Sequence, residues 1–319
     1  MRLPTAWFAA TIAIMSETHP LPIVDGQPRQ RRLPPWLKRP LPVGDALIQT
    51  RKLVNGLKLN TVCVEARCPN LSECWSRHTA TFMILGEKCT RACRFCAVTT
   101  ARPEPPDEGE PGRLAEAAVH LGLRHVVITS VARDDLDDEG AGHFARCIEA
   151  VHASRPGVTV EVLVPDFHAR RDCVQTVLDA RPEVFNHNVE TVASLHKRIR
   201  PQAKYARSLE TLRLAKELAP EITTKSGVMV GLGEPREELL QVFRDLRAVG
   251  CDLLTIGQYL QPMQSPRHAP VEHYYTPDEF KTLGEEAEAL GFRGVASGPF
   301  VRSSYFAETL YRETGTESK

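Results

Sequence analysis

Six of the nine cysteines lie between residues 63 and 96, where they form two groups of three. The two spacings are Cys63-x4-Cys68-x5-Cys74 and Cys89-x3-Cys93-x2-Cys96. Thiolate sulfur is a soft ligand that selects zinc, copper or iron–sulfur clusters. Three protein ligands leave a tetrahedral zinc ion or a four-iron cluster with one open position, and metal chemistry takes place at such positions. The two triplets therefore predict two metal centres, each without a fourth cysteine.

Disulfide bonds and structural zinc are the alternative interpretations of these cysteines. Disulfide scaffolds are short and rich in cysteine, whereas this chain has 319 residues and nine cysteines. Structural zinc prefers paired C-x2-C or Cys/His sets, and the one C-x2-C pair here, Cys93 and Cys96, belongs to a triplet. The remaining cysteines occur singly in apolar segments, where a free thiol packs as a small apolar group. We assign no role to Cys147, Cys173 and Cys251.

The composition gives the chain no overall electrostatic preference for a partner. Lysine and arginine total 40, and aspartate and glutamate also total 40. Such a balance does not favour nucleic acid or an anionic membrane, so we predict neither as a partner. The length exceeds the usual single domain, yet barrels of alternating strands and helices reach it as one unit.

The N-terminus contains an apolar run, Ala6 to Met15, that imitates the start of a secretory signal. No small-residue cleavage site follows the run, and it is too short to span a bilayer. We interpret it as a disordered extension, with Met15 as an alternative start, rather than as a targeting segment. Because a protein that carries thiolate-bound clusters belongs in a reducing compartment, we predict a cytoplasmic location.

A basic, proline-rich stretch follows, with seven prolines from Pro20 to Pro42 among arginines and lysines. This composition predicts an extended arm over residues 1–42. The arm is either a solvated tail or a docking strap for an acidic partner domain. Trp36 and Leu37, in its middle, favour a segment that packs.

From residue 81 onward, short apolar runs alternate with amphipathic segments, which is the pattern of a parallel sheet wrapped by helices. The clearest helix begins at Pro235, carries an apolar stripe from Leu239 to Val249 and ends at Gly250. We predict an α/β fold, an incomplete (β/α)6 TIM-type barrel over residues 81–298. An auxiliary segment over 43–80 precedes it and a short C-terminal segment over 299–319 follows it. The six predicted strands are Thr81–Leu85, His125–Ser130, Val158–Val164, Val184–Val189, Ile222–Val230 and Asp252–Gly257.

In such barrels the active site lies at the C-terminal ends of the strands. The Cys89–Cys96 triplet directly follows the first predicted strand and so falls at this end. We expect the first triplet to fold over the same face. An open side of the barrel would admit a large substrate.

The second triplet, Cys89-Thr-Arg-Ala-Cys93-Arg-Phe-Cys96, resembles the signature of the radical S-adenosylmethionine superfamily. The resemblance implies that these cysteines hold three irons of a 4Fe-4S cluster. The fourth iron would then bind the amino and carboxylate groups of S-adenosylmethionine. In that superfamily, an electron from the cluster cleaves a C–S bond of this cofactor and yields a 5′-deoxyadenosyl radical.

The first triplet and the C-terminal Arg302-Ser303-Ser304-Tyr305 resemble the corresponding motifs of the lipoyl synthase family. The likeness covers about residues 35 to 306. It continues through Thr129–Leu136, Asn186–Val192, Lys225–Gly227 and Gly257–Pro262.

The resemblance implies insertion of two sulfur atoms at C6 and C8 of an octanoyl chain carried on a lysine of a lipoyl carrier domain. Two S-adenosylmethionine molecules would be used, and a second, auxiliary 4Fe-4S cluster would be consumed as the sulfur source. Its ligands would be Cys63, Cys68, Cys74 and Ser303, with Ser304 as the alternative to Ser303. The implied partners are an E2 subunit or the glycine cleavage H protein as carrier, and a flavodoxin or ferredoxin as electron donor.

We expect S-adenosylmethionine to be bound at the strand ends. Phe95 would lie against the adenine or serve as a core aromatic, and Lys225 would contact a carboxylate or be a solvated strand end. The segment Gly227-x-Met229-x-Gly231 resembles one in which the backbone approaches the adenine, although a glycine pattern alone is weak. The full set of expected contacts is Phe95, Thr129, Ser130, Asn188, Glu190, Lys225, Gly227, Met229 and Gly231.

One loop departs from the family pattern, because Glu139 stands where the family usually has a glycine. A glutamate would be strained there if the position requires a positive φ. We otherwise expect the acidic run from Asp134 to Glu139 to be a solvated loop.

Two other functions compete with this interpretation. One is another radical sulfur-inserting enzyme, acting on a biotin precursor or a transfer RNA base, although the balanced charge disfavours RNA. The other is a non-enzymatic iron–sulfur or zinc protein for electron transfer or sensing.

Overall fold

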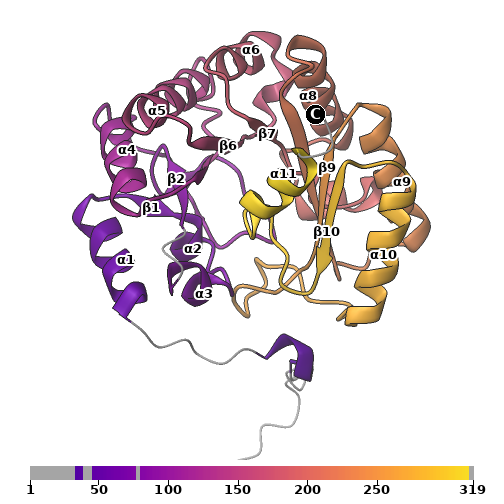
Figure 1. The fold of residues 1–319 in the computed structure, drawn as a ribbon. Helices are drawn as coiled ribbons and strands as arrows, with labels where there is room; N and C mark the ends of the chain where they lie inside the picture. The colour runs from indigo at the N-terminus through magenta and orange to yellow at the C-terminus, as the bar shows by residue number, and fades with distance from the viewer. Residues whose placement is uncertain (1–32, 39–44, 77–79, 316–319) are drawn as a thin grey trace, which may run out of the picture. The chain divides into compact units, whose positions relative to one another are not determined.

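An open barrel forms the centre of the protein in the computed structural model, which describes residues 33–38, 45–76 and 80–315 (Figure 1). Residues Pro34–Lys319 make one compact unit. The arm predicted over residues 1–42 lies outside the described residues, except for residues 33–38. Within that short piece Leu37 is buried and the Trp36 indole donates to the Tyr275 carbonyl at 3.1 Å, which agrees with a segment that packs.

The wall of the barrel is an eight-stranded sheet in the order β1-β2-β5-β6-β7-β8-β9-β10. All neighbours are parallel except β1, which runs antiparallel to β2. In the described chain the two ends of this order, β1 and β10, do not pair, so the barrel is open, as predicted. The strands are β1 (Asn60–Thr61), β2 (Thr81–Ile84), β3 (Lys88–Cys89), β4 (Thr99–Thr100), β5 (His125–Ser130), β6 (Thr159–Leu163), β7 (Val184–Asn186), β8 (Thr223–Val230), β9 (Leu253–Gln258) and β10 (Gly294–Gly298).

Helices cover the outside of this wall (Figure 1). The predicted helix after Pro235 is confirmed as α9, whose Leu239, Phe243 and Leu246 are buried against the sheet. The helices are η1 (Pro35–Leu37), α1 (Asp45–Gly56), α2 (Val62–Glu65), α3 (Leu71–Ser76), α4 (Glu110–His120), α5 (Ala141–Ser154), η2 (Phe167–Ala169), α6 (Arg171–Asp179), η3 (Ala193–Leu195), α7 (His196–Ile199), α8 (Tyr205–Leu218), α9 (Arg236–Ala248), α10 (Pro277–Ala289) and α11 (Ala307–Gly315). None of the described helices is both long and apolar enough to cross a membrane.

All six predicted strands are confirmed: His125–Ser130 has the predicted bounds, and the bounds of the other five differ by at most three residues. Each is followed by at least one helix, so the six predicted βα units are present. A further parallel strand, β10, was not predicted, because the segment Gly294–Gly298 is made of glycine and small residues that have low strand propensity. It pairs with β9 and extends the wall.

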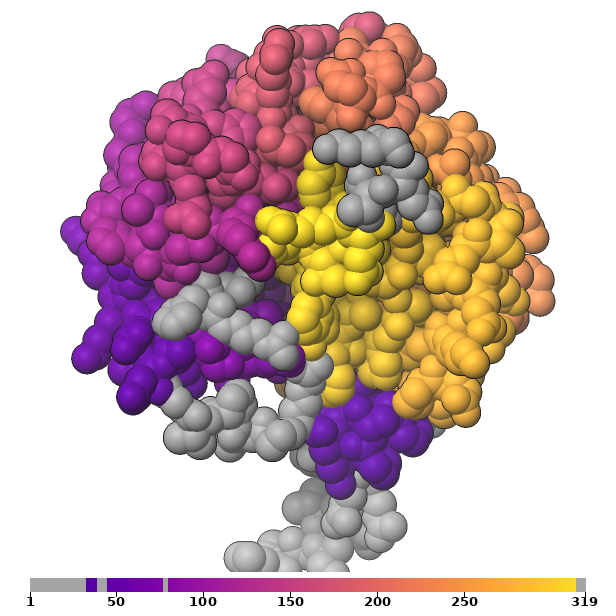
Figure 2. Space-filling view, viewed as in Figure 1, coloured from indigo at the N-terminus to yellow at the C-terminus, as the bar shows by residue number. Residues whose placement is uncertain are grey.

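The C-terminal helix α11 does not join the outer layer. It contacts β5 and β10, which lie far apart in the sheet order, and its Glu308 pairs with Arg124 at the start of β5 at 3.0 Å. In the space-filling view the C-terminal residues, in yellow, gather at the centre of the face that Figure 1 presents (Figure 2). The C-terminal segment therefore closes the N-terminal end of the barrel.

Candidate active site

The second cysteine triplet lies in the loop after β2, at the C-terminal end of the barrel. The short strands β3 and β4 pair through Cys89 and Thr100 and hold the two ends of this loop together. The Cys89 sulfur accepts hydrogen bonds from the backbone N–H groups of Arg91 and Ala132, both at 3.4 Å. All nine cysteines are among the described residues, and none of them forms a disulfide. The loop therefore presents three thiols that a cluster could bind.

Burial favours the protonated form of these thiols. It raises the pKa of Cys96 to about 12, and it also raises that of Cys93. A metal ligand must be the thiolate, so binding of a cluster here would release protons. The donor set, three soft sulfurs on one short loop, fits an iron–sulfur cluster.

Arg91, between two of the cysteines, ties the loop to the barrel. Its buried guanidinium donates to both oxygens of Asp134, at 2.6 and 2.8 Å, and lies 2.8 Å from an Asp166 oxygen. Asp166 follows β6 and also accepts from Arg207 at 2.7 Å. Burial alone would raise the pKa of Asp166, but Arg91 and Arg207 outweigh it and hold that pKa below its ordinary value. Arg91 therefore connects the loops after β2, β5 and β6.

The other half of the loop is held by the segment that follows β9. The Arg94 side chain donates to the Pro266 carbonyl at 3.1 Å, and the Ala269 N–H donates to the Arg94 carbonyl at 2.9 Å. The His268 ring lies 3.1 Å from the Cys96 carbonyl. Contacts within the protein thus hold the cysteine loop on both sides.

Three of the residues expected to bind S-adenosylmethionine offer polar groups at strand ends. The hydroxyl of Ser130, at the end of β5, is buried and has no hydrogen-bond partner among the described residues. Asn188, after β7, donates to Glu190 at 3.2 Å, and burial raises the pKa of Glu190. An unpartnered buried hydroxyl and a desolvated carboxylate suit the hydroxyl and amino groups of a ligand. The hydroxyl of Thr129, by contrast, donates to the Leu163 carbonyl at 2.7 Å.

Phe95 and Met229 lie together on one small apolar cluster near the cysteine loop. Both pack against the buried cluster formed by Ile199, Leu232, Tyr259 and Ala269. The Gly231 N–H donates to the Glu234 carboxylate at 2.6 Å. Phe95 and Met229 thus pack against other apolar side chains, and the Gly231 backbone is bonded to Glu234. That these three residues bind the cofactor remains a prediction.

Lys225 is not a solvated strand end, and that alternative is wrong. The side chain is 1 % exposed because it points into the barrel from β8, where Glu161 neutralises its charge. Gly227, on the same strand, lies beside the C-terminal segment: a Cβ placed there would come within 2.8 Å of the Ser303 hydroxyl. Lys225 and Gly227 therefore both face Ser303.

The interior of the barrel accommodates the C-terminal segment through a second glycine. A Cβ on Gly257, in β9, would lie 2.2 Å from the Val301 carbonyl oxygen, which is closer than atoms can approach. A Gly257→Ala variant is therefore expected to displace residues 301–305 and to lower the free energy of unfolding by about 1–3 kcal/mol. Hydrogen exchange of this segment and urea unfolding would measure both effects. Gly56→Ala, at a helix end where nothing lies near an added Cβ, is the control, and equal exchange in the two variants would contradict the prediction.

The first cysteine triplet lies at the opposite end of the barrel from the second, so the expectation that it folds over the same face is wrong. The physical reason is the antiparallel pairing of β1 with β2, which brings residues after β1 to the start of β2. Cys63 accordingly lies beside Thr81. Cys74 shares a cavity of about 340 Å³ with residues that begin β5, such as His125.

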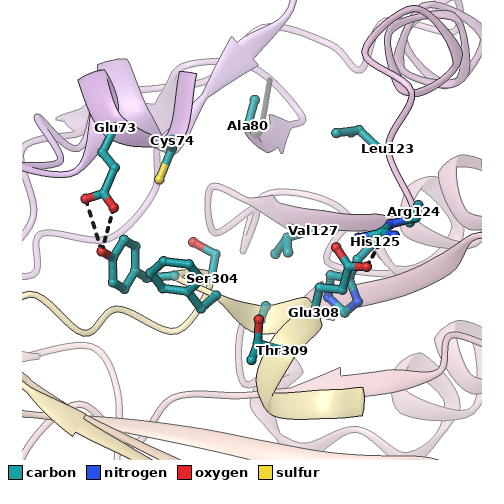
Figure 3. Close-up of a pocket in the computed structure, with 13 residues that line it drawn as sticks. Glu73, Cys74, Ala80, Leu123, Arg124, His125, Val127, Ser304, Glu308 and Thr309 are labelled. Atoms are coloured by element: carbon teal, nitrogen blue, oxygen red, sulfur yellow. Dashed lines mark hydrogen bonds and ion pairs between the residues drawn. The ribbon is translucent and has the colours of Figure 1, made fainter. Parts of the chain in front are cut away.

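The two candidate serines are separated in the structure. Ser304 and Cys74 line the same cavity, which Figure 3 shows, whereas the Ser303 hydroxyl donates to the Asn188 side chain at 2.9 Å. Tyr305 donates to Glu73, the neighbour of Cys74, at 3.0 Å. The C-terminal motif thus reaches the segment of the first triplet, and the choice of Ser303 as a ligand remains a prediction.

The acidic run from Asp134 to Glu139 is exposed at its four aspartates, as expected, but its last residue is buried. Glu139 is 5 % exposed, and its carboxylate lies 2.9 Å from the His168 ring. Its φ is +52°, so the position does require the backbone that favours glycine, and the glutamate there is strained. Contact with His168 offsets part of that cost.

Two residues of the site were missed in the sequence. Arg91 was visible as a charged residue inside a metal-binding loop, and Asp166 as an acid two residues after the predicted strand Val158–Val164. Neither signal distinguishes a buried ion pair from a solvated surface charge.

Comparison with known proteins agrees with this geometry. The family model described as Radical SAM superfamily matches residues 83–246, which is more than half of the chain. The chain is thus a radical S-adenosylmethionine protein, whose cofactors are S-adenosylmethionine and 4Fe-4S clusters. The model of the N-terminal domain of lipoyl synthase matches residues 17–68. The chain belongs to the lipoyl synthase family, as the following relatives show.

Two curated relatives cover most of the chain. A lipoyl synthase of Rubrobacter xylanophilus is 54% identical over 296 residues, which are 90% of this chain and 92% of the relative. A lipoyl synthase of Caldanaerobacter subterraneus subsp. tengcongensis is 55% identical over 277 residues, which are 87% of this chain and 96% of the relative. Family membership excludes the non-enzymatic iron–sulfur or zinc protein.

Solved structures resemble the fold at low sequence identity. The FeFe-hydrogenase maturase HydG has a TM-score of 0.53 and 16% identity, covering 79% of this chain and 62% of that chain. Streptococcus suis SuiB, crystallised with S-adenosylmethionine, has a TM-score of 0.50 and 12% identity, covering 76% and 56% respectively. These likenesses support the barrel fold alone.

Proposed function

We propose that this chain catalyses the lipoyl synthase reaction, the insertion of sulfur at C6 and C8 of an octanoyl chain carried on a lysine. The observation that supports this best is the presence of two cysteine triplets at opposite ends of one barrel, the first of which shares a cavity with Ser304 of the C-terminal segment. Neither carbon is acidic, so an enzyme needs a radical to remove the hydrogen. Two separate centres match a reaction that needs both a radical source and a sulfur source.

The second triplet would serve the radical step. Cys89, Cys93 and Cys96 would hold the resident 4Fe-4S cluster, which with S-adenosylmethionine supplies the hydrogen-abstracting radical. Arg91 fixes the backbone donors to the Cys89 sulfur. Such hydrogen bonds to the sulfurs tune a cluster.

The cofactor would be oriented by groups at the strand ends. Ser130, Asn188 and Glu190 would bind it, because they offer a hydroxyl, an amide and a carboxylate in a buried position. Phe95, Thr129, Met229 and Gly231 lie around the same end of the barrel and would shape the pocket. Burial of these groups excludes water from the reacting centre.

The first triplet would hold the second cluster, which is a substrate because its sulfur ends in the product. Cys63, Cys68 and Cys74 would be its thiolate ligands, and Ser303 would complete the set, with Ser304 as the alternative. An oxygen ligand is harder than the thiolates that iron–sulfur clusters prefer. That ligand would therefore be the easiest to release when the cluster is consumed.

The reaction class defines the partners. The acyl substrate would arrive on a lipoyl carrier domain, either an E2 subunit or the glycine cleavage H protein. A one-electron donor such as a flavodoxin or ferredoxin would reduce the resident cluster, and the reducing cytoplasm suits both clusters.

A reconstitution experiment tests the proposed function. Anaerobically reconstituted protein is expected to bind about eight irons and to convert an octanoylated carrier domain to the lipoylated form. Cys93→Ala is expected to lose cleavage of S-adenosylmethionine to background. Wild-type protein that cleaves S-adenosylmethionine without inserting sulfur would contradict the proposal, and unchanged cleavage by Cys93→Ala would remove the second triplet from the radical step.

A further inference from the structure

A buried ion pair crosses the interior of the barrel between β6 and β8. The Lys225 ammonium lies 2.9 and 3.1 Å from the two oxygens of Glu161, and both side chains are almost fully buried. Asn186 donates to the same carboxylate at 3.0 Å, and the His125 ring lies 3.3 Å from it. Burying such a pair is costly unless its remaining hydrogen-bonding groups are satisfied. Glu161 is thus fully occupied by protein groups.

The remaining strong contact of Lys225 is with the C-terminal motif. Its ammonium donates to the Ser303 carbonyl at 2.6 Å. A hydrogen bond from a charged donor is shorter and stronger than one between neutral groups. Ser303 is therefore held twice, by Lys225 through its carbonyl and by Asn188 through its hydroxyl.

The face of β8 that points inward is shaped for this contact. Residues two apart on a strand share a face, so Lys225 and Gly227 both point toward the interior. The absence of a side chain at Gly227 leaves room for the Ser303 hydroxyl. Lys225 and Gly227 are two of the nine positions expected to bind S-adenosylmethionine, and both are directed at Ser303 instead.

We propose that Lys225, held by Glu161, is a positioning residue for the C-terminal serine ligand of the sacrificial cluster and is not a contact of S-adenosylmethionine. The inference rests on the proposed function of that motif. The inference applies whether Ser303 or Ser304 is the ligand. Lys225 holds the Ser303 carbonyl, and the next residue, Ser304, lies in the cavity that Cys74 lines, so the same hydrogen bond directs the chain into that cavity. Loss of the anchor should loosen the serine and weaken only the cluster of the first triplet.

The test compares two variants with the reconstituted wild-type enzyme. Lys225→Met removes the ammonium at similar length, and Lys225→Met/Glu161→Gln removes both charges and so avoids an unpaired buried carboxylate. Both are expected to bind nearer about four irons than eight, to lose the spectroscopic signature of the first-triplet cluster and to lower lipoylated product by about tenfold or more. Binding and cleavage of S-adenosylmethionine are expected to stay within about twofold of wild type, because the Lys225 side chain bonds to Glu161 and Ser303 and not to the cysteine loop, Ser130 or Glu190.

Lys216→Met is the matched control. Lys216 also pairs with a strand carboxylate, Asp252 at 2.8 Å, and donates to a backbone carbonyl, that of Ile222 at 3.1 Å. This variant is expected to keep the full iron content, because neither of these two partners belongs to the C-terminal segment. If Lys216→Met loses the first-triplet cluster to the same extent, the positioning role of Lys225 is refuted.

Three further outcomes decide the proposal. If the Lys225 variants keep both clusters but lose binding of S-adenosylmethionine, Lys225 is a cofactor contact and the inference is wrong. If they keep both clusters and full product formation, Lys225 positions nothing and the inference is wrong again. If the single variant does not fold, the double variant decides by the same readouts. Failure of the proposed function itself would appear separately, as wild-type enzyme without a first-triplet cluster or without sulfur insertion.

Discussion

A Cys68→Ala variant is expected to cleave S-adenosylmethionine yet form lipoylated product only at background level. Cys68 belongs to the triplet at the start of the strands, whereas the cysteine loop that serves the radical step lies at their far ends. The variant should therefore lose one cluster and bind about four irons instead of eight. Mass spectrometry of the carrier domain, chromatography of 5′-deoxyadenosine and iron analysis measure the three effects.

Cys173→Ala is the control for this prediction. Cys173 is buried in α6 and belongs to neither triplet, so its variant should keep all irons and form product. Lipoylated product from Cys68→Ala at the wild-type rate would refute the sacrificial role of the first triplet. Loss of iron in the control would show that iron content reports overall stability instead.

An Arg91→Met variant is expected to lose stability and radical chemistry together. Removing one partner of a buried ion pair costs about 3–5 kcal/mol, and here Asp134 loses the guanidinium while Asp166 keeps only Arg207. The cysteine loop would also lose its tie to β5 and β6. We expect the free energy of unfolding to fall by about 3 kcal/mol and cleavage of S-adenosylmethionine to fall by about tenfold or more.

Urea unfolding under anaerobic conditions and the cleavage assay measure these effects. Arg171→Met provides the control, since Arg171 and its partner Glu217, 2.8 Å away, are both exposed and surface pairs are worth at most about 1 kcal/mol. An Arg91→Met variant that unfolds like the wild type would mean that the three loops are held by their backbones alone.

The parts of the fold with strong local patterns were predictable from the sequence. Short, mostly apolar runs such as His125–Ser130 predict strands that are buried on both faces. Pro235 and Gly250 mark the two ends of α9. The segment Gly294–Gly298 lacks that signal, because pairing with β9 and not its own composition makes it a strand. The cysteine loop was predictable because its spacing is local.

The arrangement of the site across the barrel was harder to predict. The end at which the first triplet lies depends on whether β1 runs parallel or antiparallel to β2, and a two-residue strand carries no sign of its direction. The role of Lys225 depends on Glu161 and Ser303, which are 64 and 78 residues away in the chain. Without knowledge of Glu161 and Ser303, a lysine near the start of a strand is predicted to be exposed to solvent.

The insertion of residues 300–305 into the barrel also has a consequence for the order of folding. Their partners come from the whole length of the chain: Asn70 holds the Phe300 carbonyl across 230 residues, and Asn188 holds Ser303 across 115. Contacts between such distant residues form late, because the loop between them must first be closed. The ribosome also releases this segment last. We therefore expect the two serines to be among the last residues to reach their places in the barrel. A nascent chain that lacks its final twenty residues would have all six cysteines of the two triplets but neither serine.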